Sequence, residues 1–177
     1  MKDYTLKILV LGDPTTGKEE LLKKYAARIF REDKELTIGV EFLAKETEID
    51  GKQGKLQLWD FRGEERSLHS LYSRGANGAF ILYDITDSKS LNYVPEWLQI
   101  IRENTGDIPI LLVGNKLDME QNREVSKEQI EILKKQYDIS SSIEISVKTG
   151  ENVEKMFLAI TEMILEKKGI KMKINPL

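Results

Sequence analysis

The sequence predicts an α/β protein in which helices cover both faces of a mostly parallel β-sheet. Strand-like apolar segments alternate with segments of helical periodicity along the whole chain. Some strand-like segments, such as 79–86 and 108–115, are continuously apolar, as expected for strands that are buried on both faces. The 177 residues contain no repeat and no linker-like stretch, so we expect one domain with a single core.

Each expected element follows from a local pattern. Apolar residues that alternate or run together predict strands, and apolar residues three or four positions apart predict helices. The predicted strands are 6–12, 40–50, 55–60, 79–86, 108–115 and 141–146. The predicted helices are 18–30, 90–104, 126–137 and 152–168. Ser126 and Gln129 form a capping-box pattern at one helix start, and the short join at 49–55 predicts an antiparallel hairpin at one sheet edge.

Composition and charge exclude several kinds of function. The net charge of −3 with mixed signs argues against a nucleic acid polymer as partner. The chain has no cysteine, which excludes disulfides, zinc–thiolate sites and a C-terminal prenylation cysteine. No segment approaches the roughly 20 apolar residues of a membrane-spanning helix. We therefore expect a cytoplasmic monomer that reaches a membrane only through a missing tail or through partners.

The loop between the first strand and the first helix, GDPTTGKEE, has the spacing of a phosphate-binding loop. Gly12, Gly17 and Lys18 match G-x-x-x-x-G-K, a pattern in which backbone N–H groups and a helix N-terminus hold an anion. Lys18 is expected to reach the outer phosphates and to act in catalysis. The residues expected to line the nucleotide here are Gly12, Asp13, Pro14, Thr15, Thr16, Gly17, Lys18, Glu19 and Glu20. An ordinary glycine-rich turn is the alternative for this pattern taken alone.

Two further loops, each directly after a predicted strand, have the polar groups needed to recognise guanine. Asp118 can accept hydrogen bonds from the N1–H and 2-amino groups of guanine, a donor pair that adenine lacks. Asn115 can tie the base to the loop, and the methylene stem of Lys116 can lie along the base plane. Backbone N–H groups in the loop ISVKTG can meet the guanine O6. These groups belong to Ser146, Val147 and Lys148. An ordinary strand-end turn is the alternative for NKLD alone.

Three more residues are candidates for the metal and the γ-phosphate. Asp60 ends strand 55–60 and is placed to bind Mg²⁺ directly or through water. Thr37, in a loop before an edge strand, has a hydroxyl that can reach the same ion. Gly63 offers a backbone N–H that no side chain obstructs. A strand-end turn is the alternative for Asp60, and an ordinary surface threonine is the alternative for Thr37.

These signals occur in one order that converges on the carboxyl ends of the strands, and the sequence resembles the Ras superfamily of small GTPases, within it the Rab branch. The resemblance runs from about residue 5 to residue 168 and rests on IGVEF, KLQLWD, RGANGAFILYDIT, NKLD and SVKTG. It implies a P-loop NTPase fold of three layers, α/β/α, with a six-stranded mostly parallel sheet, one antiparallel edge strand and five helices. A single G domain spanning 1–177 is expected.

The resemblance also implies a function and roles for individual residues. It implies a GTP/GDP switch with Mg²⁺, whose effector and regulatory proteins contact switch loops at about 31–41 and 60–74. By the same resemblance, Phe30 lies edge-on to the guanine, Thr37 binds the metal, and Gly63 belongs to the second switch.

The departures from the family pattern concentrate at the metal and at the attacking water. Glu19 replaces the Ser or Thr that ligates Mg²⁺, Arg62 replaces an alanine, and Glu64 replaces the glutamine that orients the water. A carboxylate cannot donate a hydrogen bond to the transition state as an amide can. We therefore predict slow hydrolysis, with Glu64, Gly63 and Lys18 as the catalytic residues.

Two arrangements of the metal side are open. In the first, Glu19 and Arg62 form a compensating pair and Arg62 takes over part of the charge role of the metal. In the second, both side chains point to solvent and Mg²⁺ is bound through Asp60, Thr37 and the phosphates. The candidate metal ligands are Thr37, Asp60 and Glu19. His69, the only histidine, is expected to face the solvent.

Two functions of different class remain. The leading interpretation is a guanine-nucleotide switch with weak GTPase activity. The alternative is a nucleotide-binding scaffold, a pseudo-GTPase that does not cycle by hydrolysis. An ATP-using P-loop kinase is disfavoured by NKLD and by the lack of an arginine-rich lid segment.

Overall fold

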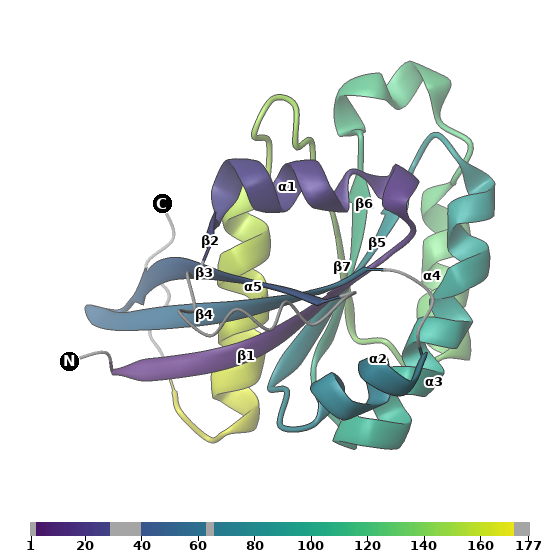
Figure 1. The fold of residues 1–177 in the computed structure, drawn as a ribbon. Helices are drawn as coiled ribbons and strands as arrows, with labels where there is room; N and C mark the ends of the chain where they lie inside the picture. The colour runs from purple at the N-terminus through teal and green to yellow at the C-terminus, as the bar shows by residue number, and fades with distance from the viewer. Residues whose placement is uncertain (1–2, 29–39, 63–65, 172–177) are drawn as a thin grey trace.

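The computed structural model describes residues 3–28, 40–62 and 66–171. These residues form one sheet with helices on both faces, as predicted (Figure 1). The strands are β1 (Tyr4–Leu11), β2 (Ala27–Arg28), β3 (Val40–Ile49), β4 (Lys52–Phe61), β5 (Gly78–Asp84), β6 (Ile110–Asn115) and β7 (Ser141–Glu144). The α-helices are α1 (Lys18–Tyr25), α2 (Arg66–Ser73), α3 (Val94–Thr105), α4 (Lys127–Gln136) and α5 (Val153–Lys167). Short 3₁₀ helices are η1 (Pro14–Thr16), η2 (Ser88–Tyr93) and η3 (Leu117–Asn122).

The sheet has the order β2-β3-β4-β1-β5-β6-β7. Five neighbouring strands, from β4 to β7, are parallel, and β3 pairs antiparallel with β4 through the predicted hairpin. The six strands of four or more residues are the six that were predicted. The two-residue strand β2 extends the sheet beyond β3. Because the parallel strands end at the same edge, their C-terminal loops lie together, and that edge is where the predicted motifs fall.

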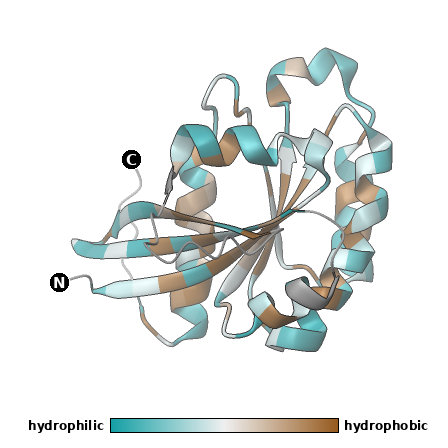
Figure 2. Ribbon diagram, in the orientation of Figure 1, coloured by the Kyte–Doolittle hydropathy of each residue, from teal (hydrophilic) through white to brown (hydrophobic). Residues whose placement is uncertain are grey.

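The two faces of the sheet have separate hydrophobic cores. Strand β1 contributes to both, since Leu6, Ile8 and Val10 face one core while Leu9 and Leu11 face the other. Helices α1 and α5 cover the first face, and α2, α3 and α4 cover the second. Figure 2 shows these helices turning their apolar residues toward the sheet. Such alternation fits a strand in the middle of a sheet that is buried on both sides.

Two predicted helix boundaries were wrong by four or five residues, and one helix was not predicted from its pattern. The helix expected over 18–30 ends at Tyr25, because Ala26 is extended and residues 27–28 pair with β3. The helix expected over 90–104 begins at Val94 after a 3₁₀ segment, which places Pro95 in its first turn, where proline is tolerated. Helix α2 lies in a segment for which we had predicted no element. No helix among the described residues is long and apolar enough to cross a membrane.

Candidate nucleotide-binding site

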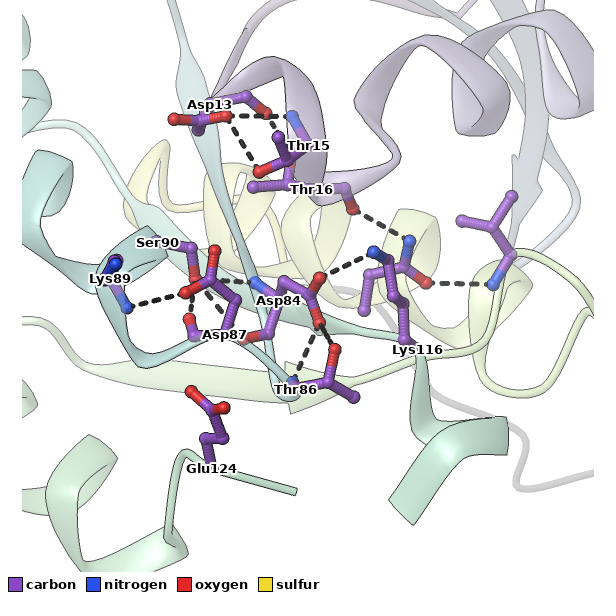
Figure 3. Close-up of polar contacts among 12 residues, drawn as sticks. Asp13, Thr15, Thr16, Asp84, Thr86, Asp87, Lys89, Ser90, Lys116 and Glu124 are labelled. Atoms are coloured by element: carbon purple, nitrogen blue, oxygen red, sulfur yellow. Dashed lines mark hydrogen bonds and ion pairs between the residues drawn. The ribbon is translucent and has the colours of Figure 1, made fainter. Parts of the chain in front are cut away.

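The predicted phosphate loop has a conformation that only its glycines permit. Gly12 and Gly17 both have positive φ, 149° and 83°. A Cβ at Gly17 would lie 2.3 Å from Nδ2 of Asn115. Between them, Asp13 caps the 3₁₀ turn, because its carboxylate accepts hydrogen bonds from the backbone N–H and the hydroxyl of Thr15, both at 2.9 Å (Figure 3). Pro14 has no N–H, so this residue can shape the loop but cannot donate a hydrogen bond to a phosphate.

Lys18 is the first residue of α1 and is almost fully buried. Its Nζ lies 2.8 Å from Oδ1 of Asp60 and donates a 2.6 Å hydrogen bond to the carbonyl oxygen of Phe61. The amine therefore crosses from the phosphate loop to the end of β4. Lys18 and Asp60, two residues predicted to serve the same site, are therefore in direct contact.

Asp60 is completely buried at the end of β4 and contacts a second cation. Nε of Arg62 donates a 2.8 Å hydrogen bond to Oδ2 of Asp60, while Nη2 of Arg62 donates to Glu41 on β3. Register brings the two carboxylates together, because Glu41 lies opposite Asp60 in the β3–β4 pair. Burial tends to lower the pKa of Arg62, but the hydrogen bond to Asp60 and the charges of Asp60, Glu41 and Glu19 outweigh it and raise that pKa above its ordinary value.

The Glu19 side chain has a different partner from the one predicted. It is 58 % exposed, and its carboxylate lies 3.0 Å from Nζ of Lys23, one turn along α1. A direct ion pair with Arg62 is not found among residues 3–28, 40–62 and 66–171, so that prediction was wrong; Glu19 acts on Arg62 only through its charge. The alternative was wrong for Arg62, which binds Asp60 and Glu41 and does not point to solvent. Its exposed Glu19 agrees with the structure, and its Mg²⁺ ligands remain a prediction.

Asn115 joins the phosphate loop to the loop that follows β7. Its Nδ2 donates to the carbonyl oxygen of Thr16 at 2.9 Å, and its Oδ1 accepts from the N–H of Val147 at 3.1 Å. Ser146 Oγ donates a 2.7 Å hydrogen bond to Oδ1 of Asp118. The loops predicted to bind phosphate and guanine thus form one hydrogen-bonded unit, with the Asp118 carboxylate held by the second base loop.

Lys24 and Lys116 make contacts around the site that the sequence did not reveal. Lys24 donates from α1 to the carbonyl oxygens of Val147 and Lys148, at 2.9 and 3.0 Å. Lys116 has the left-handed backbone φ of 73°, and its Nζ lies 2.6 Å from Asp84, which also accepts from the N–H and hydroxyl of Thr86 (Figure 3). The sequence signal for the contact of Lys116 with Asp84 was the position of Asp84 at the end of a buried strand.

A bidentate ion pair clamps the segment beyond Asp118 to β7. Nη1 and Nη2 of Arg123 lie 2.7 and 2.8 Å from the two carboxylate oxygens of Glu144. The hydrogen bonds and charge of Arg123 hold the pKa of Glu144 below its ordinary value, although burial opposes them. Asn152 donates to the carbonyl oxygen of Glu144 at 2.9 Å. The pair sits at the entrance to the loop 145–150 and therefore supports the predicted guanine side.

A cavity of about 710 Å³ opens beside the phosphate loop. Residues of the phosphate loop and around the end of β4, among them Gly12, Lys18, Asp60 and Arg62, line one part of it, and side chains of α2, η2 and α3 line the other. His69 belongs to this second part. The prediction that His69 faces the solvent was wrong, because its side chain is buried. Its ring stacks on that of Phe61 with the ring centroids 5.0 Å apart, and the centroid of the Trp97 ring lies 5.2 Å away. His69 lies in α2, which was not predicted, so its packing against Phe61 and Trp97 could not be expected from the sequence.

Four predicted site residues lie outside the described residues. They are Phe30, Thr37, Gly63 and Glu64. Their assigned roles remain predictions.

Comparison with known proteins shows the family. The model of the Ras family matches residues 7–166. The chain belongs to the Ras family. The chain is 39 % identical over 178 residues to Ras-related protein Rab-8 of Diplobatis ommata, covering 99 % of this chain and 84 % of that protein. It is also 39 % identical over 170 residues to Ras-related protein Rab-13 of Rattus norvegicus, covering 94 % and 83 %. The protein is thus a Rab-like small GTPase, and membership implies binding of GTP or GDP and of Mg²⁺ in general.

The described residues do not offer Mg²⁺ the ligands that the family leads one to expect. Octahedral oxygen ligands are needed at about 2.0–2.1 Å. Each oxygen of Asp60 already contacts a cation, and the Glu19 carboxylate lies against Lys23. Within the described ranges, no group of three or more His, Cys, Asp or Glu side chains has a metal-binding arrangement. Held by these cations, the Asp60 and Glu19 carboxylates do not fit the ion as direct ligands, and Thr37 lies outside the described residues.

The role of Asn115 can be tested by substitution. Asn115→Ala leaves the buried Thr16 carbonyl and Val147 N–H without their partner, which should lower the free energy of unfolding by about 1–3 kcal/mol. Urea unfolding of the nucleotide-free protein measures this loss. Asn122→Ala, at an exposed position, is the matched control. Equal stability of the two variants would contradict the linking role.

The Arg123–Glu144 pair predicts a dependence of stability on pH. Because the pKa of Glu144 is lowered by folding, its contribution is present above the ordinary value of 4.5 and is lost as the pH falls through the folded pKa. Arg123→Met should therefore lower the free energy of unfolding by about 2 kcal/mol at neutral pH, and its difference from wild type should shrink on acidification. Urea unfolding of both proteins, from neutral pH down to below the ordinary Glu144 value of 4.5, measures the change in this difference. Lys155→Met is the control. A difference that does not change with pH would contradict the assignment.

Proposed function

We propose that this chain is a guanine-nucleotide switch formed by a single G domain over 1–177, and that it hydrolyses GTP slowly. The observation that carries the proposal is the hydrogen-bonded unit around Asn115, which links the Thr16 carbonyl to the Val147 N–H. A nucleotide bound there has its phosphates at the glycine loop and its base at Asp118, with Asn115 between the two.

Guanine selectivity rests on the Asp118 carboxylate. Ser146 donates to one oxygen of Asp118 and so orients the group. The N1–H and 2-amino donors of guanine satisfy a carboxylate, whereas adenine leaves it desolvated and unpaired, which is costly. The N–H groups of Ser146 and Val147 already donate within the chain, to the carbonyl oxygen of Glu151 and to Asn115. The backbone N–H of Lys148 then serves O6, and Phe30 is assigned edge-on to the base by the family resemblance. The glycine loop and Lys18 bind the phosphates.

The switch role requires surfaces that change with the nucleotide. The γ-phosphate would order the switch loops at about 31–41 and 60–74 through Thr37 and Gly63. Effectors would bind the loops in this ordered conformation. A group of three partly buried aromatic side chains beside these loops supports this proposal. Phe42 and Trp59 are 4.3 Å apart edge to face, and Tyr72 of α2 lies 5.7 Å from Trp59. Large aromatic side chains are typical anchors of protein interfaces.

The second candidate function, a pseudo-GTPase scaffold, is favoured by the metal side of the site. There Glu19 and Arg62 replace the residues of the family pattern, and Glu64 replaces the water-orienting glutamine. Such a protein would bind GDP or GTP without cycling through hydrolysis. The two functions share the base site and differ in the catalytic step.

The base site can be tested without knowing any partner. Denaturing the purified protein should release GDP or GTP and not adenine nucleotides. Asp118→Ala should weaken GDP binding by about 10- to 100-fold, the loss expected for hydrogen bonds to a charged group. Isothermal titration calorimetry measures the affinity. Asp107→Ala is the control. It removes an exposed carboxylate just before β6, at the end of the strand away from the predicted site, and should leave GDP affinity as in wild type. Equal affinities of the two variants would overturn the assignment.

Slow hydrolysis is tested in a single turnover. Glu64→Gln restores an amide that can donate to the transition state, so the rate should rise by about tenfold or more. Preloaded GTP is followed to GDP by chromatography, with Glu128→Gln on α4 as control. An unchanged rate in Glu64→Gln would contradict the catalytic role of Glu64. If hydrolysis is undetectable in both proteins, the scaffold function holds.

A further inference from the structure

The carboxylate of Asp60 is bound by cations of the chain itself. Nζ of Lys18 lies 2.8 Å from one oxygen, and Nε of Arg62 lies 2.8 Å from the other. The Asp60 side chain has no exposure to solvent, so its charge needs partners inside the protein. Both partners come from the regions where a nucleotide and its metal would be expected.

Arg62 is held in place from two sides. Asp60 binds Nε, and Glu41, the neighbour of Asp60 across the β3–β4 pair, binds Nη2. These contacts use two of the five N–H donors of a guanidinium. Arg62 also lines the cavity that the phosphate-loop residues Gly12 and Lys18 line. A guanidinium fixed there has the charge and the planar donors suited to phosphate oxygens.

Glu19 does not rebuild a metal site at this place. The family pattern has a hydroxyl after the loop lysine, and the longer Glu19 side chain instead pairs with Lys23 along α1. Its negative charge also raises the need for a cation near the phosphates. Arg62 supplies one at a position set by two carboxylates.

We propose that the Arg62 guanidinium, anchored on Asp60 and Glu41, takes the place of Mg²⁺ at the outer phosphates, so that this chain retains guanine nucleotide without bound metal. The inference rests on the proposed nucleotide-binding function. When Lys18 moves from Asp60 to the phosphates, Arg62 remains as the counter-ion of the buried carboxylate. One cation then serves Asp60, Glu41 and the nucleotide.

The test uses the whole chain loaded with a fluorescent GDP analogue. Its release into excess GDP is followed with Mg²⁺ and with EDTA. The release rates should agree within about twofold, because a ligand that is not bound contributes nothing to retention. The magnesium content of the purified GDP complex, measured by mass spectrometry of the elements, should be well below one ion per nucleotide.

Two variants separate Arg62 from a general effect of charge. Arg62→Ala should release the analogue about 10- to 100-fold faster, as expected for the loss of a charge-assisted hydrogen bond. Arg102→Ala removes a guanidinium that binds the carbonyl oxygens of Tyr137 and Asp138, and it should behave as wild type. The double variant Glu19→Ser with Arg62→Ala should become sensitive to EDTA. Circular dichroism checks that each variant is folded.

Each outcome decides between the possibilities. Acceleration of wild-type release by EDTA of about tenfold or more, or one Mg²⁺ per bound GDP, overturns the inference, since a bound ligand stabilises its complex. Equal release from Arg62→Ala and Arg102→Ala also overturns it. These results leave the proposed function standing. Failure of wild-type protein to bind any guanine nucleotide overturns the proposed function itself.

Discussion

A buried carboxylate must be neutralised, and the end of β4 is organised around that constraint at Asp60. Strand pairing places Asp60 beside Val10 of β1 and opposite Glu41 of β3, away from solvent. Lys18 reaches Asp60 from the end of the phosphate loop, and Arg62 reaches it from two residues further along the chain, just after β4. Removing one partner of such a group would leave a buried charge uncompensated, which is strongly destabilising. The phosphate loop, the edge strand β3 and the start of the second switch are therefore held by one set of charges.

The two halves of the site differ in how far they keep the family pattern. On the base side, Asn115, Ser146 and Asp118 form a continuous hydrogen-bonded unit. On the metal side, Glu19 and Arg62 change both the sign and the shape of the available groups. A protein can retain selectivity for guanine while altering the metal and the water, because the two sides use different loops. The site therefore joins nucleotide recognition of the usual kind to an unusual phosphate environment.

Local patterns predicted the strands and the motifs well, because both depend on short stretches of sequence. The motif spacing placed Gly17, Lys18 and Asn115 on neighbouring loops, and the structure brings them together. The contact of Arg62 with Glu41 was not predictable in this way, since it depends on the register of β3 against β4. The burial of His69 depends on Phe61 and Trp97, which are far apart in the sequence. The early end of α1 followed from strand pairing at 27–28, where tertiary structure overrode helical periodicity.

The central claim is that the Arg62 guanidinium replaces the metal at the phosphates. The most direct measurement is the equilibrium affinity for GDP, determined by calorimetry at matched ionic strength in Mg²⁺ and in EDTA. A bound metal must raise nucleotide affinity by the same factor by which the nucleotide raises metal affinity. Our account predicts dissociation constants that agree within about threefold, since there is then no coupling between the two ligands. An affinity that falls by about two orders of magnitude in EDTA, the upper range of typical coupling, would contradict it.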